Sequence, residues 1–114
     1  MKEAGTNQQP IEELVTAAVE GSHAALEEIV LRIQDRIYHL ALRMLSHPED
    51  ARDASQEILI KVITNLKGFR FEGPFAAWVF RIAANHLKTF RKSRMERFEI
   101  SWEKACGLVD QAEA

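Results

Sequence analysis

The residues best suited to chemistry lie between Phe75 and Arg94, where cationic and amide side chains recur with helical spacing. Successive residues of an α-helix are rotated by about 100°, so side chains three or four positions apart share one face. An indole, an amide and several cations share such a face: Trp78, Arg81, Asn85, Lys88 and Lys92, with Arg91 beside them. No Asp or Glu occurs between Phe75 and Arg94. This cationic face predicts a negatively charged partner.

The mixture of side chains favours an unpaired nucleic-acid strand over a general polyanion. Such a strand presents phosphates and bare base faces, which attract cations and aromatic rings. Asn85 can exchange paired hydrogen bonds with a base edge, and as a poor helix former it requires either a structural hydrogen bond or a ligand. Trp78 borders the apolar side of the helix, so it is equally well interpreted as a partly buried core aromatic. The run Arg91 to Arg94 is also explained by the negative dipole at a helix C-terminus.

The sequence contains no arrangement typical of an enzyme. His23, His39, His47 and His86 lack the spacing of metal ligands, and Cys106 is the only cysteine. There is no glycine-rich phosphate loop and no pair of carboxylates placed for acid–base work. We therefore expect a protein without catalysis, metal or cofactor.

Length and charge distribution limit the number of domains and the kind of partner that this chain can have. A chain of 114 residues with 46% hydrophobic residues fits one folded domain. Its net charge is only -2, but residues 1–60 contain 5 Lys/Arg against 11 Asp/Glu, whereas residues 61–97 contain 9 against 2. A local basic block predicts a local docking site for phosphates. The lone cysteine and the absence of a long apolar run lead us to expect a cytoplasmic protein without a membrane partner.

Apolar periodicity and capping residues predict an all-α fold, a compact bundle of about four helices. Helices are expected from Pro10 to about Gly21, from a Ser22 cap to Ser46, from Pro48 to Gly68, and from Pro74 to about Arg97. Residues 1–9 are expected to be a flexible N-terminus, and residues 98–114 a loop and linker. Phe69, Phe71, Phe75 and Phe80 are predicted to be core or turn residues.

The helix predicted after Pro48 has a second polar face. Asp53, Gln56, Glu57 and Lys61 share it, and Ile60 lies among them. An apolar residue surrounded by polar ones is typical of the centre of a docking patch. Solvated surface is the alternative interpretation, because single exposed apolar residues are common.

Two stretches together resemble one protein family. Residues 50–62 read DARDASQEILIKV, and residues 75–85 read FAAWVFRIAAN. Both resemble conserved region 2 of bacterial RNA polymerase sigma factors of the extracytoplasmic-function (ECF) group, over roughly residues 10–97. Position 84 is Ala where many relatives have a basic residue, and position 89 is Thr where many have Asp.

The resemblance implies a role in transcription initiation and two binding surfaces. Asp53, Gln56, Glu57, Ile60 and Lys61 would dock on the clamp coiled coil of the largest subunit of core RNA polymerase. Trp78, Arg81, Asn85, Lys88, Arg91 and Lys92 would contact the non-template strand of the promoter minus-10 element. An anti-sigma factor is a further partner that the resemblance implies.

Members of this family also contain a second domain with a helix-turn-helix, so we expect the sequence to be one domain of a longer protein. Residues 98–114 would then be the loop after the fourth helix, with Ser101 and Trp102 contributing to a pocket for an extruded base. Two other functions stay open. One is a helical protein-interaction domain without DNA binding, and the other is a regulator that reads duplex DNA.

Overall fold

The computed structural model describes residues 9–113, with side chains placed as far as Leu108. Its four α-helices are α2 (Ile11–Val19), α3 (His23–Leu45), α4 (Pro48–Thr64) and α5 (Phe75–Glu113), with a short 3-10 helix, η1 (Leu66–Gly68), after α4. No strand occurs within the described residues, so the predicted all-α class with four helices is confirmed. Apart from Gln9, the N-terminal segment that we expected to be flexible lies outside the described residues.

The helix boundaries follow the residues that cap them. The Ser22 hydroxyl oxygen accepts a hydrogen bond from the backbone N–H of Ala25 at 3.1 Å, as the sequence predicts for the start of α3. Pro48 occupies the first turn of α4, where its missing N–H costs nothing. The same helix ends at Thr64, short of the predicted Gly68, because the chain tightens into η1 before the loop to α5.

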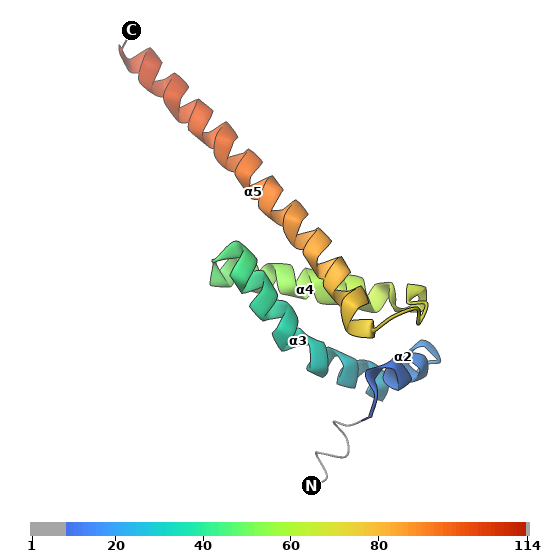
Figure 1. Cartoon of the computed structure of the whole chain (residues 1–114). Helices are drawn as coiled ribbons and strands as arrows, with labels where there is room; N and C mark the ends of the chain where they lie inside the picture. Colours follow the sequence, from blue (N-terminus) through green and yellow to red (C-terminus); the bar gives the residue numbers. More distant parts are fainter. Residues whose placement is uncertain (1–8, 114) are drawn as a thin grey trace.

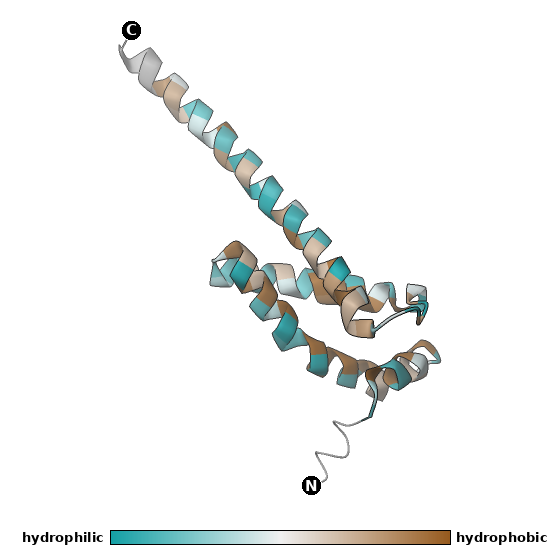
Figure 2. Cartoon of the chain, in the orientation of Figure 1, coloured by the Kyte–Doolittle hydropathy of each residue, from teal (hydrophilic) through white to brown (hydrophobic). Residues whose placement is uncertain are grey.

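The core lies where α3, α4 and α5 cross, with α2 packed against it (Figure 1). Hydrophobic residues gather at this crossing (Figure 2). The α5 side predicted to pack does so: Phe75, Val79, Ala83 and Leu87 are buried, and Ile82 and Phe90 are partly buried against them. Each fully buried aliphatic or aromatic side chain contributes roughly 1.5–3 kcal/mol through burial.

The N-terminal helix is tied to the start of α5. Leu14 and Val15 of α2 are buried in the shared core. A carboxylate oxygen of Glu12 accepts a hydrogen bond from the backbone N–H of Phe75 at 3.1 Å. That N–H has no partner within its own helix, and the N-terminal dipole of α5 favours the negative charge.

The end of α5 differs from the sequence-based expectation. We predicted a helix to about Arg97 followed by a loop, but α5 continues to Glu113 and extends away from the bundle (Figure 1). Residues 98–113 contain no proline to end the helix, although Ser101, Trp102 and Gly107 are not strong helix formers. The side chains from Met95 to Leu108 are exposed.

The extension makes the molecule long rather than compact. Its principal extents are 72 × 30 × 22 Å, and the Cα radius of gyration is 19.7 Å. A compact domain of this length has a radius of gyration of about 13 Å. In the described part of the chain, no helix is both long enough and apolar enough to cross a membrane.

Candidate nucleic-acid and protein interfaces

The cationic face of α5 is open to solvent. Arg81, Asn85, Lys88, Arg91 and Lys92 are all exposed, on the side of α5 turned away from the core. None of them forms an ion pair among the described residues. The structure therefore brings together the residues that the sequence placed on one helix face, and leaves their charges available to a partner.

Asn85 has no structural role that explains its position. Its backbone oxygen accepts a hydrogen bond from the Thr89 hydroxyl at 3.2 Å. Within the described residues its side-chain amide has no hydrogen-bond partner, and it points to solvent. Of the two explanations for an asparagine in mid-helix, a structural hydrogen bond therefore finds no support.

Trp78 is partly buried at the edge of the cationic face. Its ring centroid lies 5.5 Å from those of both Phe69 and Phe75. These rings fix the indole between the loop before α5 and the helix itself, in the offset arrangements that aromatic pairs prefer. Trp78 thus combines a core contact with an accessible edge.

A cavity of about 390 Å³ lies beside this indole. The loop from Phe69 to Pro74 forms one wall, and Trp78 and Arg81 of α5 form the other. In the loop, Phe71 adopts a positive φ of 59°, and its ring lies 4.6 Å from that of Phe69. Sequence reasoning predicted only a tight connection here, although the aromatic residues next to Gly73 and Pro74 were visible.

The segment that was expected to form a loop and a pocket after the fourth helix is helical as far as Glu113. Ser101 and Trp102 lie on the exposed half of α5, and the Trp102 ring stacks on Phe98 at 6.5 Å. The loop before α5 borders a cavity, whereas the segment after Arg97 is helical. The expected loop is wrong, because the chain keeps helical geometry after Arg97. The contribution of Ser101 and Trp102 to a pocket stays a prediction.

The α4 patch predicted from the sequence, Asp53, Gln56, Glu57, Ile60 and Lys61, also lies at the surface. Ile60 is 60% exposed although it is an aliphatic residue in a helix. Asp53, Gln56 and Lys61 have no side-chain partner among the described residues. The five residues follow a spacing of three and four, so they form one continuous strip.

Glu57 differs from its neighbours because it contacts α5. Its Oε1 lies 2.8 Å from Nε2 of His86, whose side chain is only 13% exposed. The carboxylate itself remains 56% exposed, so its second oxygen can meet a partner. His86 was dismissed at the sequence level because it lacks metal-ligand spacing. The sequence did offer an indication of a structural role: His86 comes three residues after Ala83 and directly before Leu87, so it borders the side of the helix that packs on the core.

An ion pair joins the same two helices further along. Nη1 of Arg94 lies 2.6 Å from the Asp50 carboxylate in the first turn of α4. This pairing and the His86 contact show that α4 and α5 run in opposite directions where they meet. Arg94, which belongs to the basic run, is therefore not available as Arg91 and Lys92 are. Across the described residues, no cluster of His, Cys, Asp or Glu could hold a metal ion.

The Sigma-70 region 2 family matches residues 29–97 of this chain, a range that includes both motifs and both exposed faces. The chain belongs to the sigma-70 region 2 family. The resemblance to the ECF group is confirmed by its relatives. The chain is similar to RNA polymerase sigma-H factor of Pseudomonas aeruginosa, with 32% identity over 79% of the chain and 47% of the relative. It is also similar to ECF RNA polymerase sigma factor SigW of Bacillus subtilis, with 33% identity over 66% of the chain and 40% of the relative.

A solved region 2 structure has the same fold. It is an engineered region 2 of sigmaE, determined by NMR in complex with GTAAAA, and it matches with a TM-score of 0.71 and 30% identity. The match covers 81% of this chain and 96% of the other. The chain spans less than half the length of these two curated relatives.

Proposed function

We propose that this region 2 domain acts in transcription initiation, by docking on core RNA polymerase and holding the unpaired non-template strand of the promoter minus-10 element. The observation that favours this function most is the α5 face from Arg81 to Lys92. It is exposed, free of carboxylates and equipped with an asparagine amide that has no partner in the described structure. Cations there would neutralise phosphates, and the amide would select among bases.

The cavity beside Trp78 supplies a place for an unstacked base. Its volume of about 390 Å³ exceeds that of a single aromatic ring, and Trp78 and Arg81 lie on its wall. A base that enters it could stack on an aromatic ring, which is worth roughly 1–3 kcal/mol. The complex of the related sigmaE region 2 with GTAAAA supports a nucleic-acid ligand for this fold.

The α4 strip is proposed as the polymerase surface, with the clamp coiled coil of the largest subunit as its partner. Ile60 would form the apolar centre of the interface, and Asp53 and Glu57 would pair with cations at its rim. An anti-sigma factor that covers either face would prevent initiation. We propose residues 10–97 as the functional domain.

The test separates the two surfaces. Asp53→Lys with Glu57→Lys should reduce association with core polymerase, whereas Asn85→Ala with Lys88→Ala should leave that association unchanged and reduce open-complex formation on a cognate promoter. The measurement needs the full-length sigma factor with core polymerase and permanganate footprinting of the minus-10 region. A double Asn85 and Lys88 variant with undiminished strand opening would refute the DNA role, and undiminished core binding by the charge-reversed variant would refute the docking role.

A further inference from the structure

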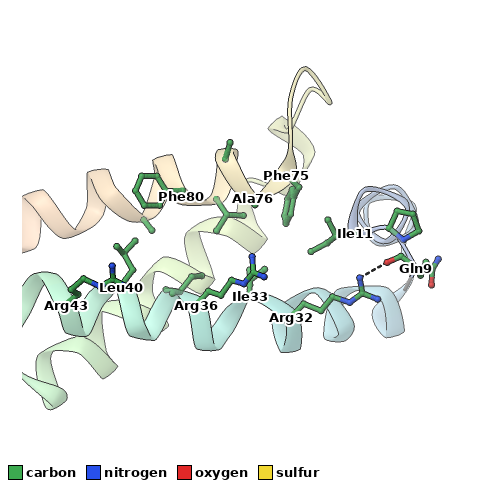
Figure 3. Close-up of a pocket in the computed structure, with 15 residues that line it drawn as sticks. Gln9, Ile11, Arg32, Ile33, Arg36, Leu40, Arg43, Phe75, Ala76 and Phe80 are labelled. Carbon is green, nitrogen blue, oxygen red and sulfur yellow. Dashed lines mark hydrogen bonds between the residues drawn. The ribbon is translucent and has the colours of Figure 1, made fainter. Parts of the chain in front are cut away.

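A second and larger hollow lies on another side of α5. It is an open groove of about 1060 Å³ between α3 and the first turns of α5, closed at one end by the chain before α2 (Figure 3). Aliphatic and aromatic side chains form most of its lining, including Ile33, Ile37 and Leu40 from α3 and Val79, Phe80 and Ala83 from α5. Residues of the 75–85 motif form its α5 wall, but none of the proposed promoter contacts lines it.

Phe80 is the clearest sign that the groove leaves apolar surface uncovered. The sequence predicts a core or turn residue, but the phenyl side chain is 57% exposed on the α5 wall of the groove, facing the α3 side that contains Leu40 and Arg43 (Figure 3). Burial of an aromatic side chain of this size is favourable, because it removes apolar surface from water. A partner that covers Phe80 would gain part of that free energy.

The charges around the groove are of one sign. Arg32, Arg36 and Arg43 line it, and no Asp or Glu does. Arg32 is held at the closed end by Glu28, at 3.0 Å, and by the backbone oxygen of Gln9, at 2.6 Å. No carboxylate of the described residues pairs with Arg36 or Arg43. These two arginines are seven positions apart in the sequence, so they lie on one side of α3, about 10.5 Å apart along its axis.

We propose that the groove binds an amphipathic helix of a partner protein, with its apolar face on Phe80 and Leu40 and its carboxylates beside Arg36 and Arg43. A helix is about 10 Å across, and helix-in-groove recognition uses apolar anchors at spacings of three, four and seven. Acidic residues one or two turns apart on the partner would match the spacing of the arginines. The charge complementarity selects an acidic helix over a basic one.

The lining favours a protein partner over a second stretch of DNA. Phe80 is an exposed ring in the groove, but Phe75 is fully buried and the rest of the lining is mostly aliphatic, so successive bases find no series of rings to stack on. Among the lining residues only Gln9, at the end, has a side-chain amide for base edges. The proposed strand contacts at Asn85 and Lys88 do not line the groove. Binding in the groove therefore does not depend on the promoter role.

The test is a display library of helical peptides, selected on the full chain and counter-selected on an Arg36→Glu, Arg43→Glu variant. Enriched peptides should be rich in Asp and Glu on one side of an apolar stripe. Their affinity should fall at least tenfold for the double variant and for Phe80→Ser, and should be unchanged for Arg52→Glu, a matched exposed arginine on α4. In ¹⁵N-resolved NMR spectra, a selected peptide should shift the amides of α3 and of the first half of α5.

Circular dichroism of each variant checks that its fold is retained, which is expected because all four substituted residues are exposed. The inference is overturned if no enriched peptide depends on Arg36, Arg43 or Phe80, or if basic peptides are selected. It is also overturned if a single-stranded oligonucleotide, rather than a peptide, binds in a manner that the Arg36→Glu, Arg43→Glu variant abolishes.

Discussion

Nε2 of His86 lies 2.8 Å from Oε1 of Glu57, so a hydrogen bond links α5, the proposed DNA-binding helix, to α4, the proposed polymerase-binding helix. The histidine is almost buried, whereas the carboxylate is mostly exposed. His86 therefore anchors one side of Glu57 and sets where the other side is presented. A residue that sequence reasoning set aside thus supports the proposed docking surface.

Replacement of His86 by Ala should destabilise the domain by about 1 kcal/mol, the usual net contribution of a hydrogen bond. Urea denaturation followed by circular dichroism measures the change. Glu57→Gln keeps an oxygen acceptor at the same position, so it serves as the matched control and should cost less. An equal loss in both variants would show that the charge of Glu57, rather than the hydrogen bond, stabilises the contact.

Lys88→Ala should weaken binding of a single-stranded minus-10 oligonucleotide and make it less dependent on salt. Loss of one phosphate contact lowers the slope of log K against log salt by about 0.7 for a single strand. Fluorescence anisotropy across a salt series measures this slope. Lys67→Ala, another exposed lysine outside the α5 face, should leave it unchanged. A Lys88→Ala slope equal to that of the parent chain would place this lysine away from the phosphates.

Ile60→Ala should weaken core polymerase binding by roughly tenfold without affecting the stability of the domain. Its side chain is 60% exposed, so truncation creates no cavity in the core, whereas a central apolar anchor is worth more than 1 kcal/mol in an interface. Leu31→Ala is the matched control, because Leu31 is 62% exposed and lies on α3. Equal core binding by the two variants would remove Ile60 from the interface.

Glu12→Ala should destabilise the domain by about 1 kcal/mol, because it removes the side chain that satisfies the Phe75 N–H at the start of α5. Thermal unfolding gives the measurement, and native-state hydrogen exchange should show faster exchange at Phe75. Glu13→Ala removes an exposed carboxylate from the same turn of α2 and should have little effect. If both variants lower the thermal midpoint equally, the lost stability comes from the helix dipole of α2 rather than from the hydrogen bond to the Phe75 N–H.

Truncation after Arg97 should leave the thermal midpoint nearly unchanged, because the described α5 side chains beyond that point are exposed. Truncation after Thr89 is the informative comparison, since it removes the partly buried Phe90 and the Arg94 ion pair with Asp50. It should lower stability by roughly 2 kcal/mol, most of it from apolar burial. A large loss from the first truncation would mean that the extended half of α5 supports the bundle.

The sequence by itself determined the four helices, the buried sides of α2 to α5, the Ser22 cap and the exposed positions of Asp53, Asn85 and Lys88. These follow from spacing along a single helix and from capping chemistry, which are local properties that periodicity reports directly. The family resemblance rested on the same local patterns.

Only the tertiary structure decided which of those residues meet across helices. Whether Arg94 pairs with Asp50, whether Glu57 contacts His86, and whether Phe80 is buried depend on how α3, α4 and α5 cross. Helix periodicity tells which side of its own helix a side chain lies on. It does not tell which neighbouring helix that side faces. For the same reason, the sequence did not decide where α5 ends. Apolar residues such as Met95, Phe98 and Trp102 recur at helical spacing in its extended half, and only the structure shows that they are exposed.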